Sequence, residues 1–288
     1  MRYAVRVGNR QGRAVVLVEN GTVDVATASQ NQFSSSVDDI VGRLDELRQW
    51  WDSAAIGVPV DVFDASMFHE LGPVVQAPSQ VFAIGLNYYA HAGEMGLALP
   101  DVPLVFSKFA SCLAGPFASI PRVSEMTDWE AELVVVVGRG GRDIRADDAL
   151  DHVAGYCVGQ DVSDRDLQMR GANAQFSMGK SHRNFGPIGP WLTSADEIAN
   201  PNNLDIQCRV NGEPFQDSNT SNMIFSVRDV VAYVSSICEL RAGDIFFTGS
   251  PDGTGKGQSP TRFLREGDVV TTTIEGLGTI VNDVVAPP

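Results

Sequence analysis

Short apolar runs separated by turn residues dominate the first part of the chain. Three runs have the length and β-branched content of strands: residues 3–7, 14–18 and 22–25. Gly12 lies between the first two runs, and Asn20-Gly21, a strong two-residue hairpin signal, lies between the second and third. From residue 37 to 51 the apolar positions recur at helical spacing. Residues 1–77 are therefore predicted to form a small β/α module.

The remainder of the chain is rich in predicted strands and irregular in order. Apolar runs predict strands at residues 81–85, 133–137, 153–158, 206–210, 245–248 and 269–274, with a hairpin turn at Asn211-Gly212. Helical spacing covers residues 226–240 and, briefly, 146–150. Because strands and helices do not alternate regularly, a doubly wound sheet and a TIM barrel are disfavoured. We expect an α+β, β-dominated fold, with a catalytic domain over residues 78–288.

Composition restricts the classes of partner. The chain has 288 residues, 43% of them hydrophobic and 20% charged, with a net charge of -15. This acidic balance argues against nucleic acid and anionic membranes, because both require a basic face. No apolar run approaches the roughly 20 residues of a membrane helix, and the first residues show no signal-peptide pattern. The four cysteines are widely separated, so we expect free thiols in a cytoplasmic protein.

Two glutamates stand at the start of the most apolar predicted strand. Glu130 and Glu132 come directly before the apolar run of residues 133–137. Alternate residues of a strand point to the same face, so both carboxylates leave one face together. Burying two like charges without a partner is costly, and a divalent cation between them would remove that cost. Charges on an edge strand are the alternative interpretation.

A third carboxylate follows another predicted strand. Asp161 comes directly after the apolar residues 153–158, a usual position for a metal ligand. Three carboxylates without a His or Cys cluster favour a hard cation, Mg²⁺ first and then Mn²⁺ or Ca²⁺. The neighbouring Asp164, Arg165 and Asp166 fit a surface ion-pair cluster equally well.

Two further segments carry candidate catalytic groups. His91 and Glu94 are three residues apart, so they would be neighbours on one helical face, where a carboxylate can orient the imidazole as a base. Gly85, Gly93 and Gly96 would allow this segment to move as a lid. Lys180 could supply positive charge to a developing enolate. An ordinary surface His-Glu pair and a solvated lysine are the alternatives.

A glycine-rich loop follows the predicted strand 245–248. Its glycines are at positions 249, 253, 255 and 257. Backbone N–H groups and the hydroxyls of Thr248 and Ser250 could hold a carboxylate or a carbonyl, although a plain turn explains the segment as well. The spacing fits neither a dinucleotide-binding fingerprint nor a phosphate-binding loop.

Taken in order, these motifs resemble the fumarylacetoacetate hydrolase family over residues 78–285. The segments concerned are Asn87-Tyr88 through Glu94, residues 128–133, residues 161–168, Gly179-Lys180-Ser181 and Thr248-Gly249-Ser250-Pro251. Residues 217–225 are similar to bacterial members, in a branch of acylpyruvases and 2-oxo-hepta-ene-dioate isomerases. Ser250 stands where many members have threonine, and residues 181–185 depart from the family pattern.

The resemblance implies a fold and a set of roles. It implies a mixed β-roll, usually assembled as a homodimer. Glu130, Glu132 and Asp161 would hold Mg²⁺ or Mn²⁺. The catalytic residues would be His91, Glu94 and Lys180, and the substrate would be bound by Arg165, Gln168, Thr248, Gly249 and Ser250.

The implied chemistry is hydrolysis of a C–C bond in a 2,4-dioxo acid, such as an acylpyruvate or fumarylpyruvate, in the catabolism of aromatic compounds or sugar acids. The same site would support decarboxylation of oxaloacetate, or isomerisation or hydration of a dienoic 2-oxo acid. A metal-stabilised binding protein without activity is a remote alternative.

Overall fold

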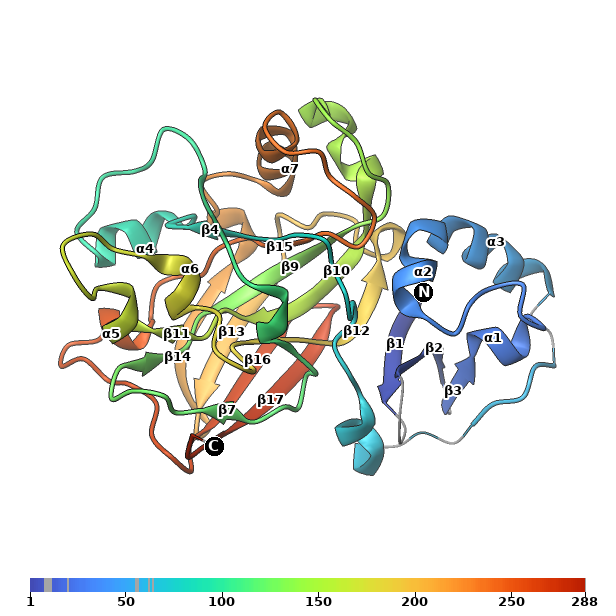
Figure 1. The fold of residues 1–288 in the computed structure, drawn as a ribbon, viewed down its shortest axis with the longest axis horizontal. Helices are drawn as coiled ribbons and strands as arrows, with labels where there is room; N and C mark the ends of the chain where they lie inside the picture. The colour runs from blue at the N-terminus through green and yellow to red at the C-terminus, as the bar shows by residue number, and fades with distance from the viewer. Residues whose placement is uncertain (8–11, 20, 55–56, 62, 64, 288) are drawn as a thin grey trace.

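A large mixed sheet organises the molecule (Figure 1). The computed structural model describes residues 1–287 apart from 8–11, 20, 55–56, 62 and 64. Over these residues the sheet has ten strands in the order β3-β2-β1-β12-β10-β9-β15-β4-β5, with β6 paired to β12. The strands are β1 (Arg2–Val7), β2 (Gly12–Val18), β3 (Gly21–Asp24), β4 (Val81–Gly85), β5 (Leu104–Ser107), β6 (Leu113–Ala114), β9 (Ala131–Val137), β10 (Val153–Gln160), β12 (Gly186–Ser194) and β15 (Ile245–Phe247).

Strand β9 is an inner strand of this sheet and is buried throughout. It pairs with β10 and β15 in antiparallel fashion. Leu133 and Val135 contribute to one apolar cluster, whereas Val134 and Val136 contribute to a second cluster on the other face. The continuous apolar run therefore forms a strand that is covered on both sides.

A second sheet packs against the first. In the described part of the chain it has the order β14-β13-β16-β17-β7. Ile206 and Cys208 of β13 belong to the same apolar cluster as Leu133 of β9. The predicted turn at Asn211-Gly212 is confirmed, with β13 and β14 paired on either side of it. The strands are β13 (Asp205–Val210), β14 (Glu213–Asn219), β16 (Val269–Ile274), β17 (Gly278–Val285) and β7 (Ile120–Pro121); β8 (Thr127–Asp128) and β11 (Ser163–Asp164) pair separately.

The N-terminal residues form β1 to β3 and a helical layer, at one side of the molecule in Figure 1. Strand β1 pairs with β12, so these strands extend the main sheet. The predicted hairpin is present, with Val18 opposite Gly21, although Asn20 lies outside the described residues. Gly12 begins β2 instead of separating two strands. The boundary after residue 77 stays a prediction.

The helix predicted over residues 37–51 is divided into three pieces. They are α2 (Val37–Ile40), the 3₁₀ turn η1 (Val41–Arg43) and α3 (Leu44–Ala54). The apolar stripe is nevertheless buried, with Ile40, Val41 and Leu47 in one cluster. Helical periodicity thus located the buried face but missed the 3₁₀ turn, because both kinds of helix bury residues spaced three or four apart.

Two other predicted helices differ in extent. The helix predicted over 226–240 is α7 (Val227–Ser235), which begins with a capping box between Ser226 and Asp229. The one predicted over 146–150 is a 3₁₀ helix, η4 (Ala146–His152). The remaining helices are α1 (Val25–Ala28), α4 (Tyr89–Glu94), α5 (Arg165–Gln168), α6 (Phe176–Gly179), η2 (Ala65–Glu70), η3 (Ala110–Cys112), η5 (Ala195–Glu197), η6 (Thr220–Asn222) and η7 (Gly255–Gly257).

The predicted fold class, α+β with strands dominating, is confirmed. Within the described residues, no helix combines the length and the apolar character that crossing a bilayer requires. The four cysteines are free, as predicted.

Candidate active site

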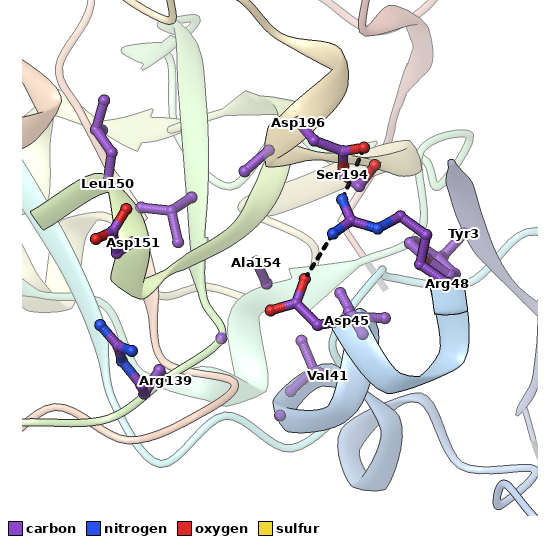
Figure 2. Close-up of a pocket in the computed structure, with 15 residues that line it drawn as sticks. Tyr3, Val41, Asp45, Arg48, Arg139, Leu150, Asp151, Ala154, Ser194 and Asp196 are labelled. Carbon is purple, nitrogen blue, oxygen red and sulfur yellow. Dashed lines mark hydrogen bonds and ion pairs between the residues drawn. The ribbon is translucent and has the colours of Figure 1, made fainter. Parts of the chain in front are cut away.

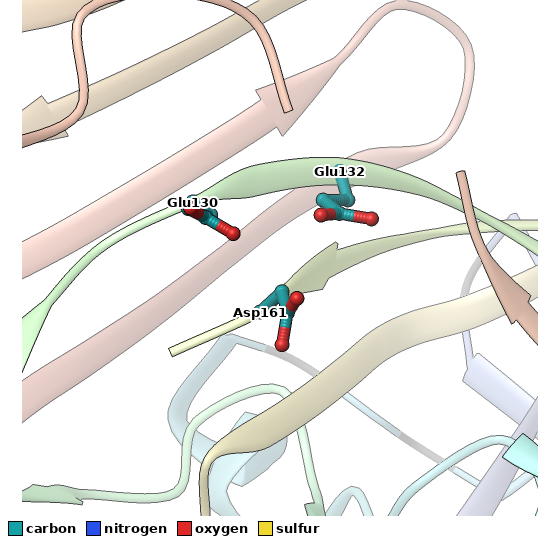
Figure 3. A group of neighbouring side chains, drawn as sticks. All are labelled: Glu130, Glu132 and Asp161. Carbon is teal, nitrogen blue, oxygen red and sulfur yellow. The ribbon is translucent and has the colours of Figure 1, made fainter. Parts of the chain in front are cut away.

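Three carboxylates meet where β9 begins and β10 ends (Figure 3). Glu132 lies in β9, Glu130 directly precedes it, and Asp161 directly follows β10. The antiparallel register places Gly159 opposite Glu132, and the Asp161 N–H donates to the Glu130 carbonyl at 2.9 Å. All three side chains are buried, and one carboxylate oxygen from each lies within 4.8 Å of the others. We call these residues the carboxylate triad.

Two buried glutamines hold the backbone of this strand end. Gln160 Oε1 accepts from the Glu130 N–H, and Gln216 Oε1 accepts from the Ala131 N–H, each at 2.9 Å. Both glutamine side chains are fully buried. They satisfy amides that would otherwise lack partners beside the triad, and an unpaired buried N–H would be costly.

Two lysines bring positive charge to the triad. Lys180, which one interpretation of the sequence left in solvent, is 3% exposed and donates to Glu130 and Asp161. Lys108, which the sequence analysis did not single out, donates to Asp161 Oδ1 at 2.6 Å and to the carbonyls of Lys180 and Phe185. Both ammonium groups are therefore committed to acceptors inside the protein.

Arg165 is buried and joins the triad to a fourth carboxylate. Its Nη2 lies 2.5 Å from Glu130 Oε1, its Nε donates to Asp128 Oδ2 at 2.8 Å, and its Nη1 donates to Gln168 Oε1 at 3.2 Å. The surface ion-pair interpretation of this segment is thus wrong for Arg165. The guanidinium orients Glu130, and the Gln168 amide nitrogen is buried without a hydrogen-bond partner in the described part of the chain.

The two glutamates of the triad have opposite pKa shifts. Burial alone would raise the pKa of Glu130, but Arg165 and Lys180 outweigh burial and lower it below its ordinary value. Burial raises the pKa of Glu132, and the nearby charges of Asp161 and Glu130 raise it further. Its carboxylate accepts the Gly249 N–H at 2.7 Å, which does not offset this repulsion.

The triad fits a hard divalent cation. Its donors are all carboxylate oxygens, the ligands that Mg²⁺, Mn²⁺ and Ca²⁺ prefer. A cation there would balance the repulsion that raises the pKa of Glu132. Glu130, Glu132 and Asp161 are the residues that could hold it.

The His91–Glu94 pair forms on α4, as the spacing predicted. His91 Nδ1 lies 3.0 Å from Glu94 Oε2, and the Gly253 N–H donates to Glu94 Oε1 at 3.0 Å. An ionised carboxylate only accepts hydrogen bonds, so Nδ1 carries the hydrogen and Nε2 of the neutral ring has the free lone pair. His91 lines the same pocket as the triad.

This active-site pocket has a volume of about 410 Å³. The triad and Lys180 line it together with Arg165, Gln168, Ser250 and Lys256. Its other side is largely apolar, formed by Leu86, Met95, Leu97, Leu104, Phe106 and Phe176. The pocket thus combines a charged floor with an apolar wall, as sites for small organic acids require.

The glycine loop brings Ser250 to the pocket, and its predicted role in substrate binding stays a prediction. Ser250 lines the pocket, and its oxygen accepts from Gln216 Nε2 at 2.8 Å, so its hydroxyl hydrogen is left to donate. Thr248 Oγ1 donates to the Leu133 carbonyl at 2.9 Å, and the Gly249 N–H donates to Glu132. Thr248 and Gly249 therefore already have partners within the protein.

A larger cavity, about 500 Å³, lies between the N-terminal helices and the main sheet (Figure 2). Arg48 dominates it and contacts both Asp45 and Asp196, at 3.4 and 2.8 Å. The charges of these three residues are thus paired with one another and partly exposed to solvent. The chemistry gathers instead in the smaller pocket over the triad.

A β-rich scaffold that gathers buried carboxylates, lysines and a His-Glu pair around one pocket defines an enzyme site. The fumarylacetoacetate (FAA) hydrolase C-terminal model matches residues 80–285. The chain therefore belongs to the fumarylacetoacetate hydrolase family and is an enzyme of that family, which confirms the resemblance seen in its motifs.

Known relatives differ in the reaction that their names describe. The chain is 43% identical to mitochondrial oxaloacetate tautomerase of Homo sapiens over 233 residues, 80% of this chain and 74% of that protein. A crystal structure of a proposed HpcE protein from Mycobacterium smegmatis is 42% identical with a TM-score of 0.92, over 100% of both chains. Maleylpyruvate hydrolase from Sphingobium sp. SYK-6, solved with manganese(II) and pyruvate, is 26% identical with a TM-score of 0.80, again over 100% of both.

Proposed function

We propose that this protein is a Mg²⁺-dependent hydrolase that cleaves a C–C bond in a 2,4-dioxo acid of the acylpyruvate or fumarylpyruvate type. The observation that carries the proposal is the placement of His91, oriented by Glu94, in the same pocket as the carboxylate triad. The similarity to a maleylpyruvate hydrolase solved with a divalent metal and pyruvate supports it.

Glu130, Glu132 and Asp161 would hold the metal in this proposal. Once bound, the metal would act as a Lewis acid toward the oxygens of the 2-oxo acid. Arg165 orients Glu130, and Lys108 orients Asp161. The protein thereby keeps the three carboxylates convergent.

The reacting groups belong to the chain itself. His91 Nε2 would take a proton from water as the water oxygen bonds to C4 of the substrate. The C3–C4 bond then breaks, its electron pair remains on C3, and a proton returned to C3 completes pyruvate. Lys180 would stabilise the negative charge that develops. Ser250 and Gln168 would donate to the substrate's carboxylate or oxo oxygens.

A second candidate function is conversion of oxaloacetate, by tautomerisation or decarboxylation. The 43% identity to an oxaloacetate tautomerase favours it. Tautomerisation needs only removal and return of a proton, which His91 could perform without an attacking water. We also propose that the protein forms a homodimer, which light scattering would test.

Nuclear magnetic resonance of the products separates the two functions. We would incubate the protein and Mg²⁺ with acetylpyruvate and, separately, with oxaloacetate. Acetate and pyruvate from the first substrate would support hydrolysis. Faster enol–keto exchange or CO₂ release from the second, with acetylpyruvate intact, would favour the second candidate.

Two variants test the assigned roles. His91→Ala should reduce hydrolysis by roughly 10²- to 10⁴-fold while Mg²⁺ affinity stays nearly unchanged. Glu132→Ala should abolish both metal binding and activity. Full activity after removal of metal with EDTA would refute the metal requirement, and hydrolysis surviving in His91→Ala would place the base elsewhere.

A further inference from the structure

Lysine is rare in this chain, and its positions are not scattered. The 21 basic residues include three lysines, Lys108, Lys180 and Lys256, and the rest are arginine. Lys108 and Lys180 are bound to the carboxylate triad, and Lys180 and Lys256 both line the active-site pocket. All three lysines therefore belong to one site, while the cations elsewhere on the chain are arginines.

Lys256 differs from the other two because, among the described residues, its ammonium group makes no hydrogen bond or ion pair. Burial lowers its pKa, the charge of Arg165 lowers it further, and the charges of Asp128 and Glu130 oppose this shift without reversing it. The carboxylates of Asp128 and Glu130 accept hydrogen bonds from the Arg165 guanidinium. Arg165 and Lys256 both line the pocket, but these two carboxylates are hydrogen-bonded to Arg165.

The backbone beneath Lys256 is held firmly. The N–H groups of Gly255 and Lys256 both donate to the buried Asp128 carboxylate, at 2.7 and 3.1 Å. Asp128 is the residue that also binds Arg165. The lysine therefore extends from a fixed point of the site, and a ligand that binds it need not order the loop first.

Lys256 is more exposed to solvent than the other hydrogen-bond donors that line the pocket. Gln168, Lys180 and Ser250 are 1%, 3% and 4% exposed, whereas Lys256 is only partly buried. Among the described residues the Gln168 amide nitrogen lacks a partner, and the Ser250 hydroxyl has a hydrogen to donate. These buried donors can receive the oxo acid end of a substrate, and Lys256, the more exposed cation of the pocket, is available for the other end.

We propose that Lys256 is a specificity-determining residue that binds a second carboxylate at the far end of the substrate, so that the enzyme prefers dicarboxylic 2-oxo acids. This inference rests on the proposed binding of 2-oxo acids in the pocket. An anion beside Lys256 would give its ammonium group the hydrogen-bonded partner that the described residues do not supply. Charge-assisted hydrogen bonds of this kind change affinity by roughly 10-fold or more.

Two ligands of equal chain length test the preference without any reaction. 2-Oxoglutarate and 2-oxopentanoate differ by a terminal carboxylate in place of a methyl group, and neither has a 4-oxo group to cleave. We would measure their dissociation constants by calorimetry, in Mg²⁺, for the wild type, Lys256→Met and Lys256→Arg. Arg262→Met is the matched control, because Arg262 follows closely in sequence but pairs with Glu213 and does not line this pocket.

We expect the wild type to bind 2-oxoglutarate about 10-fold or more tightly than 2-oxopentanoate. Lys256→Met should remove this preference by weakening 2-oxoglutarate alone, Lys256→Arg should retain most of it, and Arg262→Met should behave as the wild type. Equal weakening of both ligands would show that Lys256 binds the shared oxo acid end, and it would overturn the proposal. So would an unchanged preference in Lys256→Met, or failure of the wild type to bind either ligand.

The binding experiment and the cleavage experiment can fail independently of each other. If the binding preference follows Lys256 but neither acetylpyruvate nor the dicarboxylic fumarylpyruvate is cleaved, the hydrolase function fails while the assignment of Lys256 stands. If cleavage occurs without the preference, the reverse holds.

Discussion

Lys108 provides the sharpest test of how the site is held together. We predict that Lys108→Met destabilises the metal-free protein, although Lys108 takes no part in the proposed reaction. Lys108 is 2% exposed, and its ammonium donates to Asp161 Oδ1 and to the carbonyls of Lys180 and Phe185. Methionine has a side chain of similar length, so the change removes mainly charge and hydrogen bonds.

The expected magnitude follows from these contacts. Removing one member of a buried ion pair typically costs about 3–5 kcal/mol, because the remaining charge stays buried without its partner. Asp161 keeps Lys180 as a second partner, which reduces the cost. The two carbonyls would each lose a donor, at about 1 kcal/mol apiece. We therefore expect a loss of about 3 kcal/mol in the free energy of unfolding.

The measurement is urea unfolding in EDTA, followed by fluorescence, with Trp129 fully buried as a reporter. Lys256→Met is the matched control. It makes the same substitution in the same site, but the Lys256 ammonium group has no hydrogen bond or ion pair to a described residue, so the free energy of unfolding should change by no more than about 0.5 kcal/mol. A loss below about 1 kcal/mol in Lys108→Met, or an equal loss in both variants, would refute the reasoning.

Two further predictions concern the triad and the His-Glu pair. Because the pKa of Glu132 is raised in the folded protein above its ordinary 4.5, the contribution of Glu132 to the stability of the metal-free fold should be greatest below pH 4.5 and should be lost as pH rises through the raised pKa. Glu132→Gln should flatten this dependence in thermal unfolding with EDTA, and Mg²⁺ should then no longer raise the melting temperature; a flat wild-type profile would contradict this. A Cβ at Gly257 would lie 2.0 Å from Glu94 Cδ, so Gly257→Ala should displace Glu94 and lower kcat with metal affinity intact. Gly93→Ala on α4 meets nothing within 4 Å and should keep activity; equal kcat in the two variants would argue against the role of Glu94.

The elements that sequence analysis located correctly carry their signal locally. The apolar run of β9 predicted a buried strand, and the residues at its start and after β10 pointed to the triad. His91 and Glu94 were paired from their spacing alone. For the strand and for the His-Glu pair, the decisive neighbours lie within a few positions along the chain; the third member of the triad, Asp161, was found from its place at the end of another predicted strand.

The supporting residues carry no such local signal. Lys108 is 53 positions from Asp161, and Gln216 is 85 positions from Ala131. Their contacts exist only because β9 and β10 pair in one register and the second sheet packs against them. The scarcity of lysine would have drawn attention to Lys108 and Lys256, since three lysines among 21 basic residues invite the question of why arginine was not used.

Residue order alone therefore established a β-dominated protein with a Glu-x-Glu…Asp set and a His-Glu pair, because strand periodicity and short spacings act over a few residues. Tertiary structure decided which charges are buried and paired. It placed Arg165 and Lys180 in the interior against Glu130, and it left the Lys256 ammonium group at the same pocket without a hydrogen bond to any residue that the structure describes. The physical reason is that the energy of a charge depends on its burial and on neighbours distant in sequence, and folding alone sets both.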